Sequence, residues 1–356
     1  MQIVLRKKHL PLPIHPEFKV QLMHYQKGLS LVELMISITL GLLLTVGVTQ
    51  IFLSSKDTYR NQQASSRVQE SGRLALEFIN KDLRMAGFTG FRGRGVKTLN
   101  QIAVVNYATQ FEDGLSVYPA DSIAELNALA GTNIIVIRGV LAGESSALVA
   151  PAEVGALTVT LRSSEVGGCS DGTTRFNGIC INDSMIVADA YKSVAFRANK
   201  LELVDDGANL KIQYAGAWGG NYIDTSTYFD VGAQVSVAKT RTYFIRNGAS
   251  GEPSLFLREN ESDVQEMLEG VENIAIRFNR SDSLADYEDA ADEVDGLWGD
   301  ENPMVSVQLE VLIKSMEDNI LDEKQKFTFN EDDIEADDFR FYQTFSATVA
   351  FRNQLQ

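Results

Sequence analysis

The sequence predicts an α+β protein in which one long N-terminal helix packs on an antiparallel β-sheet in a large head domain. Three observations indicate this class: an apolar run begins at Leu29, a helical pattern continues from it to Gly87, and apolar residues then alternate with polar ones. One helix followed by many short strands is typical of α+β folds. With 356 residues, 44% of them hydrophobic, the chain can bury a large core.

The apolar run is long enough to cross a membrane. Between Leu29 and Ser55 the only charged residue is Glu33. About 25 residues in a helix span roughly 37 Å, which exceeds the ~30 Å hydrocarbon core of a bilayer. Basic residues precede the run, so the positive-inside rule keeps residues 1–28 in the cytoplasm and sends residues 56–356 across the membrane.

The helical pattern continues beyond the apolar run as an amphipathic segment. Apolar or small residues recur there at spacings of three and four, which marks one face of a helix. Gly87 is the expected stop, so one helix is predicted over about residues 30–86. The residues of the apolar face are Val68, Gly72, Ala75, Ile79, Leu83 and Ala86.

After Gly87 the pattern changes to a period of two, which predicts half-buried strands. The clearest candidates are residues 305–313 and 345–351. A change of composition at residues 200–207 suggests that the head divides there into two lobes. Shorter candidate strands are 132–138, 156–161, 184–188, 193–197, 210–214, 241–246, 254–258 and 274–279.

The two cysteines, Cys169 and Cys180, bound a short polar loop, CSDGTTRFNGIC. Two thiols that close such a loop favour a disulfide in an oxidising compartment. The bridge would stabilise the fold by roughly 3 kcal/mol on the loop-entropy estimate. The alternative is that both are unrelated free thiols.

Composition excludes several classes of function. The net charge of −16 and the concentration of basic residues before the helix leave an acidic surface that repels nucleic acid, so no autonomous nucleic-acid binding is expected. All three histidines lie within residues 1–28. If that stretch is removed, neither Ser-His-Asp nor Cys-His catalysis nor a His-ligated zinc site is available. Glycine-rich phosphate motifs and a GxSxG elbow are also absent from the sequence, and we predict that the protein is not an enzyme.

Two acidic runs are candidates for cation binding, since calcium takes six to eight oxygen ligands. Residues 281–302 are rich in carboxylates, but their spacing does not match an EF-hand loop, so a solvated insertion and a calcium site stay open as alternatives. Residues 330–338 are expected to form a charged surface turn. No other cofactor or metal is predicted. Trp218 and Trp298 are expected to be core aromatics.

The stretch KGLSLVEL, residues 27–34, resembles the processing site of type IV prepilins. The resemblance implies that a prepilin peptidase cuts after Gly28 and methylates the new amino group of Leu29. Glu33 is then the fifth residue of the mature chain. Leu29 departs from the Phe or Met that is commonest at this position.

Glu33 has a physical reason to lie in the apolar run. A carboxylate there costs about 2.5–3.5 kcal/mol on insertion scales, and it lies about 6 Å along the helix from the new amine. When subunits stack in a filament, the amine of one subunit can pair with Glu33 of its neighbour in a low-dielectric bundle. Glu33 would then set the register of assembly. The alternative is a glutamate that snorkels at the edge of a plain membrane anchor.

Longer segments resemble PilW-type minor pilins of the type IV pilus. They are SLVELMISITLGLLLTVGVTQIFLSSKDTYR and SRVQESGRLALEFINKDLRMAGF near the start, and FSATVAFRN near the end. The resemblance implies a pilin-like fold with four parts: a removed basic leader (1–28), a transmembrane or filament-core helix (29–55), its amphipathic continuation (56–87) and a periplasmic β-rich head (88–356). Members of the family often carry a cysteine where Phe91 lies here.

This resemblance implies a structural subunit that helps to initiate pilus assembly, at the tip, and that supports twitching motility, adhesion or DNA uptake. The expected partners are prepilin peptidase, other minor pilins, the major pilin, a tip adhesin and the inner-membrane assembly platform. We expect the protein in the bacterial inner membrane, with a periplasmic head, and then in the pilus at the cell surface. The alternatives are a J-type pseudopilin of type II secretion and a membrane-anchored receptor unrelated to filaments.

Overall fold

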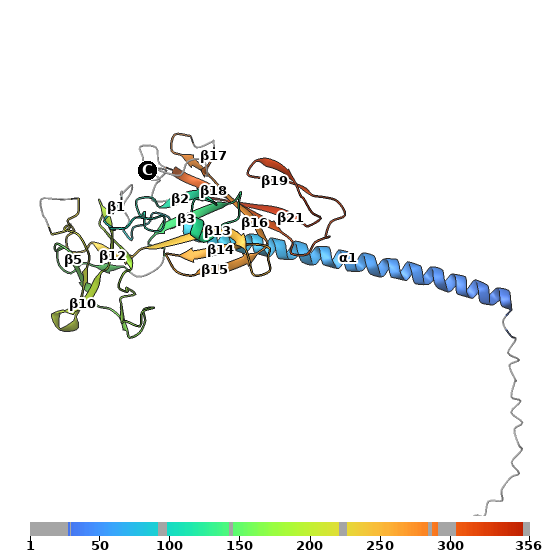
Figure 1. Ribbon diagram of the computed structural model, residues 1–356, viewed down its shortest axis with the longest axis horizontal. Coiled ribbons are helices and arrows are strands. Elements are labelled where there is room, and N and C mark those ends of the chain that lie inside the picture. The colour runs from blue at the N-terminus through green and yellow to red at the C-terminus, as the bar shows by residue number, and fades with distance from the viewer. Residues whose placement is uncertain are drawn as a thin grey trace, which may run out of the picture. The chain divides into compact units, whose positions relative to one another are not determined.

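The computed structural model describes residue 28 and residues 30–91, 98–141, 145–220, 226–283, 287–290 and 304–351. These residues fall into two units that divide after Lys56. Helix α1 (Leu31–Leu83) begins in the first unit and ends in the second (Figure 1). The second unit holds every strand of the described residues.

Helix α1 ends slightly before the predicted boundary near residue 86. Its last turns tighten, because the Met85 and Ala86 N–H groups donate to carbonyls three residues earlier. Gly87 then turns the chain with a φ of 64°, a conformation that favours glycine. The Gly87 N–H donates to the carbonyl of Arg138, 2.8 Å away, which joins the end of the helix to the sheet.

Two antiparallel sheets form the part of the head that contacts α1. One has the order β15 (Val264–Glu269), β14 (Pro253–Glu259), β13 (Lys239–Asn247), β3 (Asn133–Gly139) and β2 (Leu115–Pro119). The other has the order β17 (Glu288–Asp289), β16 (Val271–Arg280), β18 (Met304–Lys314) and β21 (Tyr342–Ala350). A hairpin of β19 (Lys326–Phe329) and β20 (Asp332–Glu335) packs beside β21, and η1 (Ala124–Leu126) lies between β2 and β3.

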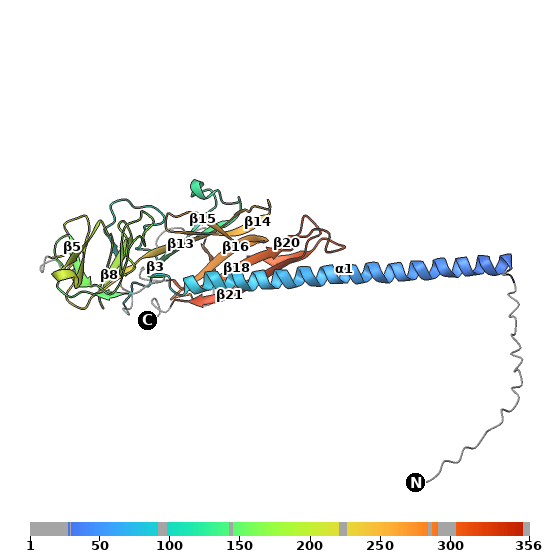
Figure 2. The same ribbon diagram turned by 90° about the horizontal axis from the view of Figure 1, so that it is seen from below.

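The main core lies between α1 and these two sheets. The helix contributes the face predicted from its spacing, since Val68, Ala75, Ile79 and Leu83 are all buried there. Gly72 allows a close approach, because a Cβ added to it would overlap the ring of Phe345 on β21. Figure 2 shows β21 running beside α1. The spacing of small and apolar residues therefore fits the helix to this sheet.

A second lobe is inserted between β3 and β13. These neighbouring strands pair at Gly139 and Lys239, and the chain between them, residues 140–238, forms further sheets with a core of their own. One sheet has the order β1 (Thr98–Asn100), β9 (Ser193–Arg197), β8 (Ser184–Ala188), β12 (Gln234–Val237) and β4 (Ser146–Ala147). Strand β1 comes from outside the insertion and pairs with β9 in parallel.

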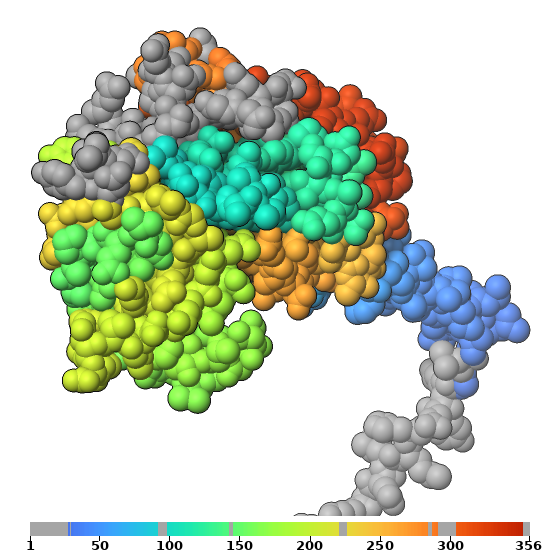
Figure 3. Space-filling model, turned by 60° about the vertical axis from the view of Figure 1, so that its left-hand side comes forward, coloured from blue at the N-terminus to red at the C-terminus, as the bar shows by residue number. Residues whose placement is uncertain are grey.

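The other sheets of the inserted lobe are smaller. One has the order β10 (Lys200–Val204), β11 (Asn209–Gln213) and β5 (Ala156–Thr160), with η2 (Asp205–Gly207) between β10 and β11. The other joins β6 (Ser164–Glu165) to β7 (Arg175–Phe176). The lobe core is centred on Phe196, Tyr214 and Trp218, whose rings contact one another. In Figure 3 the lobe is the light-green and yellow mass beside the teal and orange residues of the rest of the head.

The predicted α+β class is confirmed, and the ten predicted strands all lie on observed ones. The predicted division of the head near residues 200–207 is wrong. Those residues form β10 and η2 inside the lobe, because the true boundaries are the paired ends of β3 and β13. The charged turn predicted at 330–338 is the β19–β20 hairpin, whose turn residues Asn330 and Glu331 have positive φ.

Candidate functional site

The candidate processing site lies just before α1. Gly28 is exposed, and a Cβ added to it would meet nothing within 4 Å. Its φ lies outside the left-handed region that favours glycine. Neither packing nor backbone strain in the described residues therefore requires glycine at this position. Leu29, the predicted new N-terminus, lies outside the described residues.

Ser30 and Glu33 begin the helix together. The Glu33 N–H donates to the Ser30 hydroxyl at 3.2 Å, and the Leu34 N–H donates to the Ser30 carbonyl at 3.1 Å. A serine followed three residues later by glutamate is the pattern of a capping box. A negative charge in the first turn also interacts favourably with the helix dipole. The capping role of Ser30 was not predicted, although the Ser-x-x-Glu spacing signals it.

Glu33 has an exposed side chain and forms no ion pair with any residue in the described part of the chain. The segment around it is mostly apolar, with Leu31 76% exposed and Met35 59% exposed, and Ser30 and Ser37 are the polar residues one turn away on its own face. An ionised carboxylate surrounded by apolar surface is costly when water is withdrawn, and a cationic partner removes most of that cost. Within the described chain that partner is missing.

The first half of α1 exposes apolar side chains on all sides, from Leu31 to Leu53. Helix α1 is the one helix of the described residues that is long and apolar enough to cross a membrane. Its hydroxyl groups are satisfied internally: Ser37 and Thr45 donate to carbonyls four residues earlier, at 2.7 and 2.8 Å. Such internal bonds are what an apolar environment demands. The surface of this segment is therefore suited to lipid or to a bundle of similar helices.

The last turn of α1 is fixed to the head by a buried carboxylate. Asp82, only 1% exposed, accepts hydrogen bonds from the Tyr243 hydroxyl and from Arg241, each at 2.6 Å. Arg241 also donates to Glu259 at 3.2 Å. Burial, together with the charge of Asp82, raises the pKa of Tyr243, so its hydroxyl stays protonated as the donor. The sequence did not predict this network; its one local signal is an aspartate beside the apolar face of the helix.

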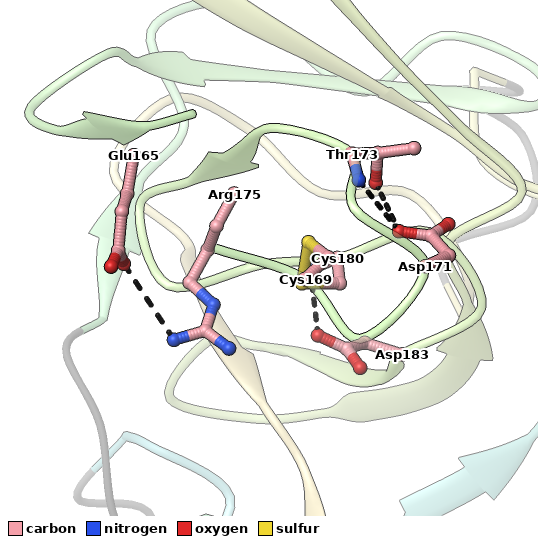
Figure 4. Close-up of a disulfide and its surroundings, with 7 residues drawn as sticks. All are labelled: Glu165, Cys169, Asp171, Thr173, Arg175, Cys180 and Asp183. Carbon is pink, nitrogen blue, oxygen red and sulfur yellow. Dashed lines mark hydrogen bonds and ion pairs between the residues drawn. A yellow bond between two sulfur atoms is a disulfide. The ribbon is translucent and has the colours of Figure 1, made fainter. Parts of the chain in front are cut away.

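The structure joins Cys169 to Cys180 in a disulfide, and no free cysteine remains. The loop is held by further contacts, shown in Figure 4. The Cys180 N–H donates to Asp183 at 2.7 Å, and the Thr173 N–H donates to Asp171 at 2.9 Å. Burial raises the pKa of Asp183, and the Cys180 N–H only partly offsets this. The bridge closes a loop of the inserted lobe, far along the chain from the N-terminal motif.

The described parts of the two acidic runs do not gather their carboxylates into a cation site. The described residues contain no group of three or more His, Cys, Asp or Glu that could hold a metal ion. Most of the acidic run 281–302, including Trp298, lies outside the described residues. Trp218 is buried in the core of the inserted lobe, as predicted.

Comparison with known proteins agrees with these features at both ends of the chain. Residues 23–49 match the prokaryotic N-terminal methylation motif, which covers Gly28 and Glu33. Residues 242–353 match the family of type IV pilus-assembly protein W, PilW. That match begins within β13 and leaves out the inserted lobe. No curated protein and no solved structure matches the chain.

The matched family consists of structural pilins rather than enzymes. The methylation motif and the single apolar helix together indicate membrane anchoring. The chain is thus similar to PilW-type minor pilins of the type IV pilus, and the resemblance predicted from its sequence is confirmed.

Proposed function

We propose that the protein is a minor pilin that helps to initiate assembly of a type IV pilus. The observation that carries this proposal is that an exposed Gly28 precedes an apolar helix in which Glu33 has no ion-pair partner among the described residues. A prepilin peptidase cuts after Gly28 and methylates Leu29. Because neither packing nor strain calls for glycine at position 28, recognition by the peptidase explains its presence.

Glu33 then acts in assembly. Its carboxylate has no cationic partner in the described chain, and the new amine of an adjacent subunit supplies one. The pair forms in an apolar bundle, where an unpaired carboxylate is costly. A well-placed ion pair therefore favours one register of the two subunits over the others. The capping bond that the Glu33 N–H donates to the Ser30 hydroxyl keeps the first turn of α1 regular, so that the carboxylate and the amine are held at a constant spacing.

The size of the head supports a position at the tip. The inserted lobe adds residues 140–238 to the part of the chain that resembles PilW. A head of this bulk is hard to repeat along a tightly packed shaft, so the protein stands with other minor pilins at the end of the filament. It would contact the major pilin below it, a tip adhesin above it and the inner-membrane assembly platform while the filament starts. From there it supports twitching motility, adhesion or DNA uptake.

The proposed location follows from the same features. The basic leader stays in the cytoplasm, α1 spans the inner membrane, and the head folds in the periplasm, where an oxidising environment suits the Cys169–Cys180 bridge. Assembly then carries the protein to the cell surface.

Deletion of the gene tests the function. We expect the deletion to reduce surface pili strongly and the full-length chain to restore them, while secretion through a type II system is unchanged. Normal piliation with impaired type II secretion would instead assign the protein to the pseudopilins.

A further inference from the structure

Strand β21 lies at the edge of its sheet. Among the residues that the structure describes, it pairs with β18 alone, which leaves one side of most of its backbone without a strand partner. The Phe351 N–H donates to the Val305 carbonyl at 2.9 Å, and the Ser315 N–H donates to the Phe341 carbonyl at 2.8 Å. Because bonded pairs alternate along an antiparallel ladder, the odd-numbered residues of β21 bond to β18. The N–H and C=O groups of the even-numbered residues therefore point away from the sheet.

This open edge begins after Tyr342. The Gln325 side chain donates to the Tyr342 carbonyl and accepts from its N–H, both at 2.8 Å, and so closes the edge at that one residue. In the described part of the chain no main-chain group bonds to the outward N–H and C=O groups of the four residues that follow, and the open edge is about 20 Å long. Those four residues are Thr344, Ser346, Thr348 and Ala350.

The composition of β21 sets it apart from the other edge strands of five residues or more, since β1 and β4 are edges of only three and two residues. Proteins normally protect an edge strand with charges, with proline or by keeping it short. Here β15 carries Glu266 and Glu269, β10 carries Lys200, and β2 ends at Pro119. Strand β5 is covered, because the Val149 N–H donates to one of its carbonyls at 3.0 Å. Strand β21, YQTFSATVA, has nine residues with neither a charge nor a proline.

Antiparallel pairing with β21 of a second copy does not fit the edge, an argument that rests on the proposed membrane anchoring. Strand β21 runs in the same direction as α1, as Figure 2 shows. The contacts agree: Arg67 pairs with Glu317 near the start of the strand, and Gly72 meets Phe345 further along. Antiparallel pairing of β21 with β21 of a second copy would therefore set the two α1 helices in opposite directions. Two chains that enter one membrane by the same end of α1 cannot be arranged in that way.

The charges beside the edge indicate which kind of strand would fit it. At the Thr344 end of the edge, the Thr344 hydroxyl donates to the Thr328 carbonyl at 2.8 Å, which places the β19–β20 hairpin beside it. That hairpin exposes Asp332 and Asp333, while its one lysine, Lys326, pairs with Glu335 at 3.5 Å, so the hairpin is acidic on balance. A strand lying on the edge would meet uncharged backbone along its length and carboxylates at this one end. Basic residues at that end of the strand would be favoured.

We propose that the edge of β21, from Thr344 to Ala350, takes up one extended strand of a different protein. The segment is uncharged where it pairs and carries Lys or Arg at the end beside the β19–β20 hairpin. Main-chain hydrogen bonds supply the affinity, and the acidic hairpin fixes the direction of the strand.

Photo-cross-linking in living cells tests the proposal on the full chain. The probe, p-benzoylphenylalanine, replaces Ser346 or Ala350, and a control chain carries it at Glu266 on the charged edge of β15. The expected result is cross-linking of both β21 positions to one identified protein. Peptide mapping should place the two contact sites four residues apart in one segment, as strand pairing requires, with basic residues at the predicted end. The control position should give no such product.

Two variants of Thr348 separate strand pairing from other contacts. Thr348→Pro removes an outward N–H but no bond to β18, so the sheet is retained, whereas Thr348→Ala keeps the N–H. Loss of that donor should lower the cross-link yield from Ala350 about tenfold in the proline variant only. Ser346→Lys is a further variant, because lysine protects natural edges, and it should lower the yield similarly.

The proposal is overturned by cross-links to a second copy of this chain, by contact sites without the four-residue spacing, by the absence of any product, or by equal yields from the proline and alanine variants. The proposed function fails differently. In the same sample, a mature chain that keeps residues 1–28 would contradict pilin processing, whatever the cross-links show.

Discussion

The Tyr243 hydroxyl on β13 donates a hydrogen bond of 2.6 Å to the carboxylate of Asp82 in the last turn of α1. Both residues are almost completely buried. The contact ties the helix to the sheet at the point where the chain leaves α1, and Arg241 completes it from the same strand. The end of the helix is therefore held by a polar contact as well as by apolar packing.

Removing this donor should destabilise the head. Tyr243→Phe leaves the buried Asp82 carboxylate short of one hydrogen bond, which costs about 1–3 kcal/mol. The measurement is the free energy of unfolding of the full chain in detergent, by chemical denaturation. Tyr191→Phe is the control, because Tyr191 is 89% exposed, and it should change nothing. Equal stability of the two variants would contradict a structural role for the Asp82 contact.

Acid should weaken the same region through Glu259. Burial acts to raise the pKa of Glu259, but the hydrogen bond from Lys239 and the charges of Lys239 and Arg241 outweigh it and lower that pKa. A carboxylate with a lowered folded-state pKa stabilises the fold fully above the unfolded-state value. That contribution is lost as the pH falls below about 4.3, the ordinary value, and through the folded-state pKa.

The pH dependence is measured as the free energy of unfolding between neutral and acidic pH. The wild-type chain should lose stability in the acidic range, and Glu259→Gln should show a shallower slope there. An identical slope in both chains would exclude Glu259 as a source of the acid sensitivity.

The inserted lobe should be separable from the pilin part of the head. Gly139 and Lys239 pair directly, so residues 140–238 can be replaced by Asn-Gly, which favours a two-residue hairpin turn. We expect a chain that still unfolds cooperatively but is less stable, because Ile102 and Phe111 lose their cover from the lobe. Circular dichroism through a thermal ramp checks this. A chain without cooperative unfolding would show that the lobe is an essential part of the fold.

Much of this fold could be predicted because its signals are local. The apolar face of α1 and strands β18 and β21 follow from the periods of three to four and of two residues. Strand β15, VQEMLE, was missed because much of it is exposed, so no alternation marks it. The Asp82–Tyr243 contact and the Gly139–Lys239 boundary join residues far apart in the sequence, and no local pattern reports such pairs.

The candidate site was predicted almost entirely from one short motif. Gly28, Leu29 and Glu33 lie within a few residues of one another, so their spacing could be read directly. The open edge of β21 could not be found in that way. An uncharged strand looks the same in sequence whether its neighbour is present or absent.

Glu33 should matter for assembly and not for insertion. Glu33→Val removes a carboxylate that costs about 2.5–3.5 kcal/mol in the membrane, so the variant should insert and be cut at least as well as the wild type. It should not restore surface pili in a deletion strain, and neither should Glu33→Gln, which keeps the size but not the charge. The number of surface pili per cell is counted by electron microscopy. Normal piliation with either variant would contradict the role of Glu33 in setting the register of assembly.

The mature N-terminus tests the central claim most directly. Mass spectrometry of the protein from cells should find a chain that begins at Leu29 and carries a methyl group on its amine. Gly28→Ala should block this processing and leave the full-length chain. Recovery of wild-type protein with residues 1–28 still attached, or of a normally shortened chain from the alanine variant, would contradict the account.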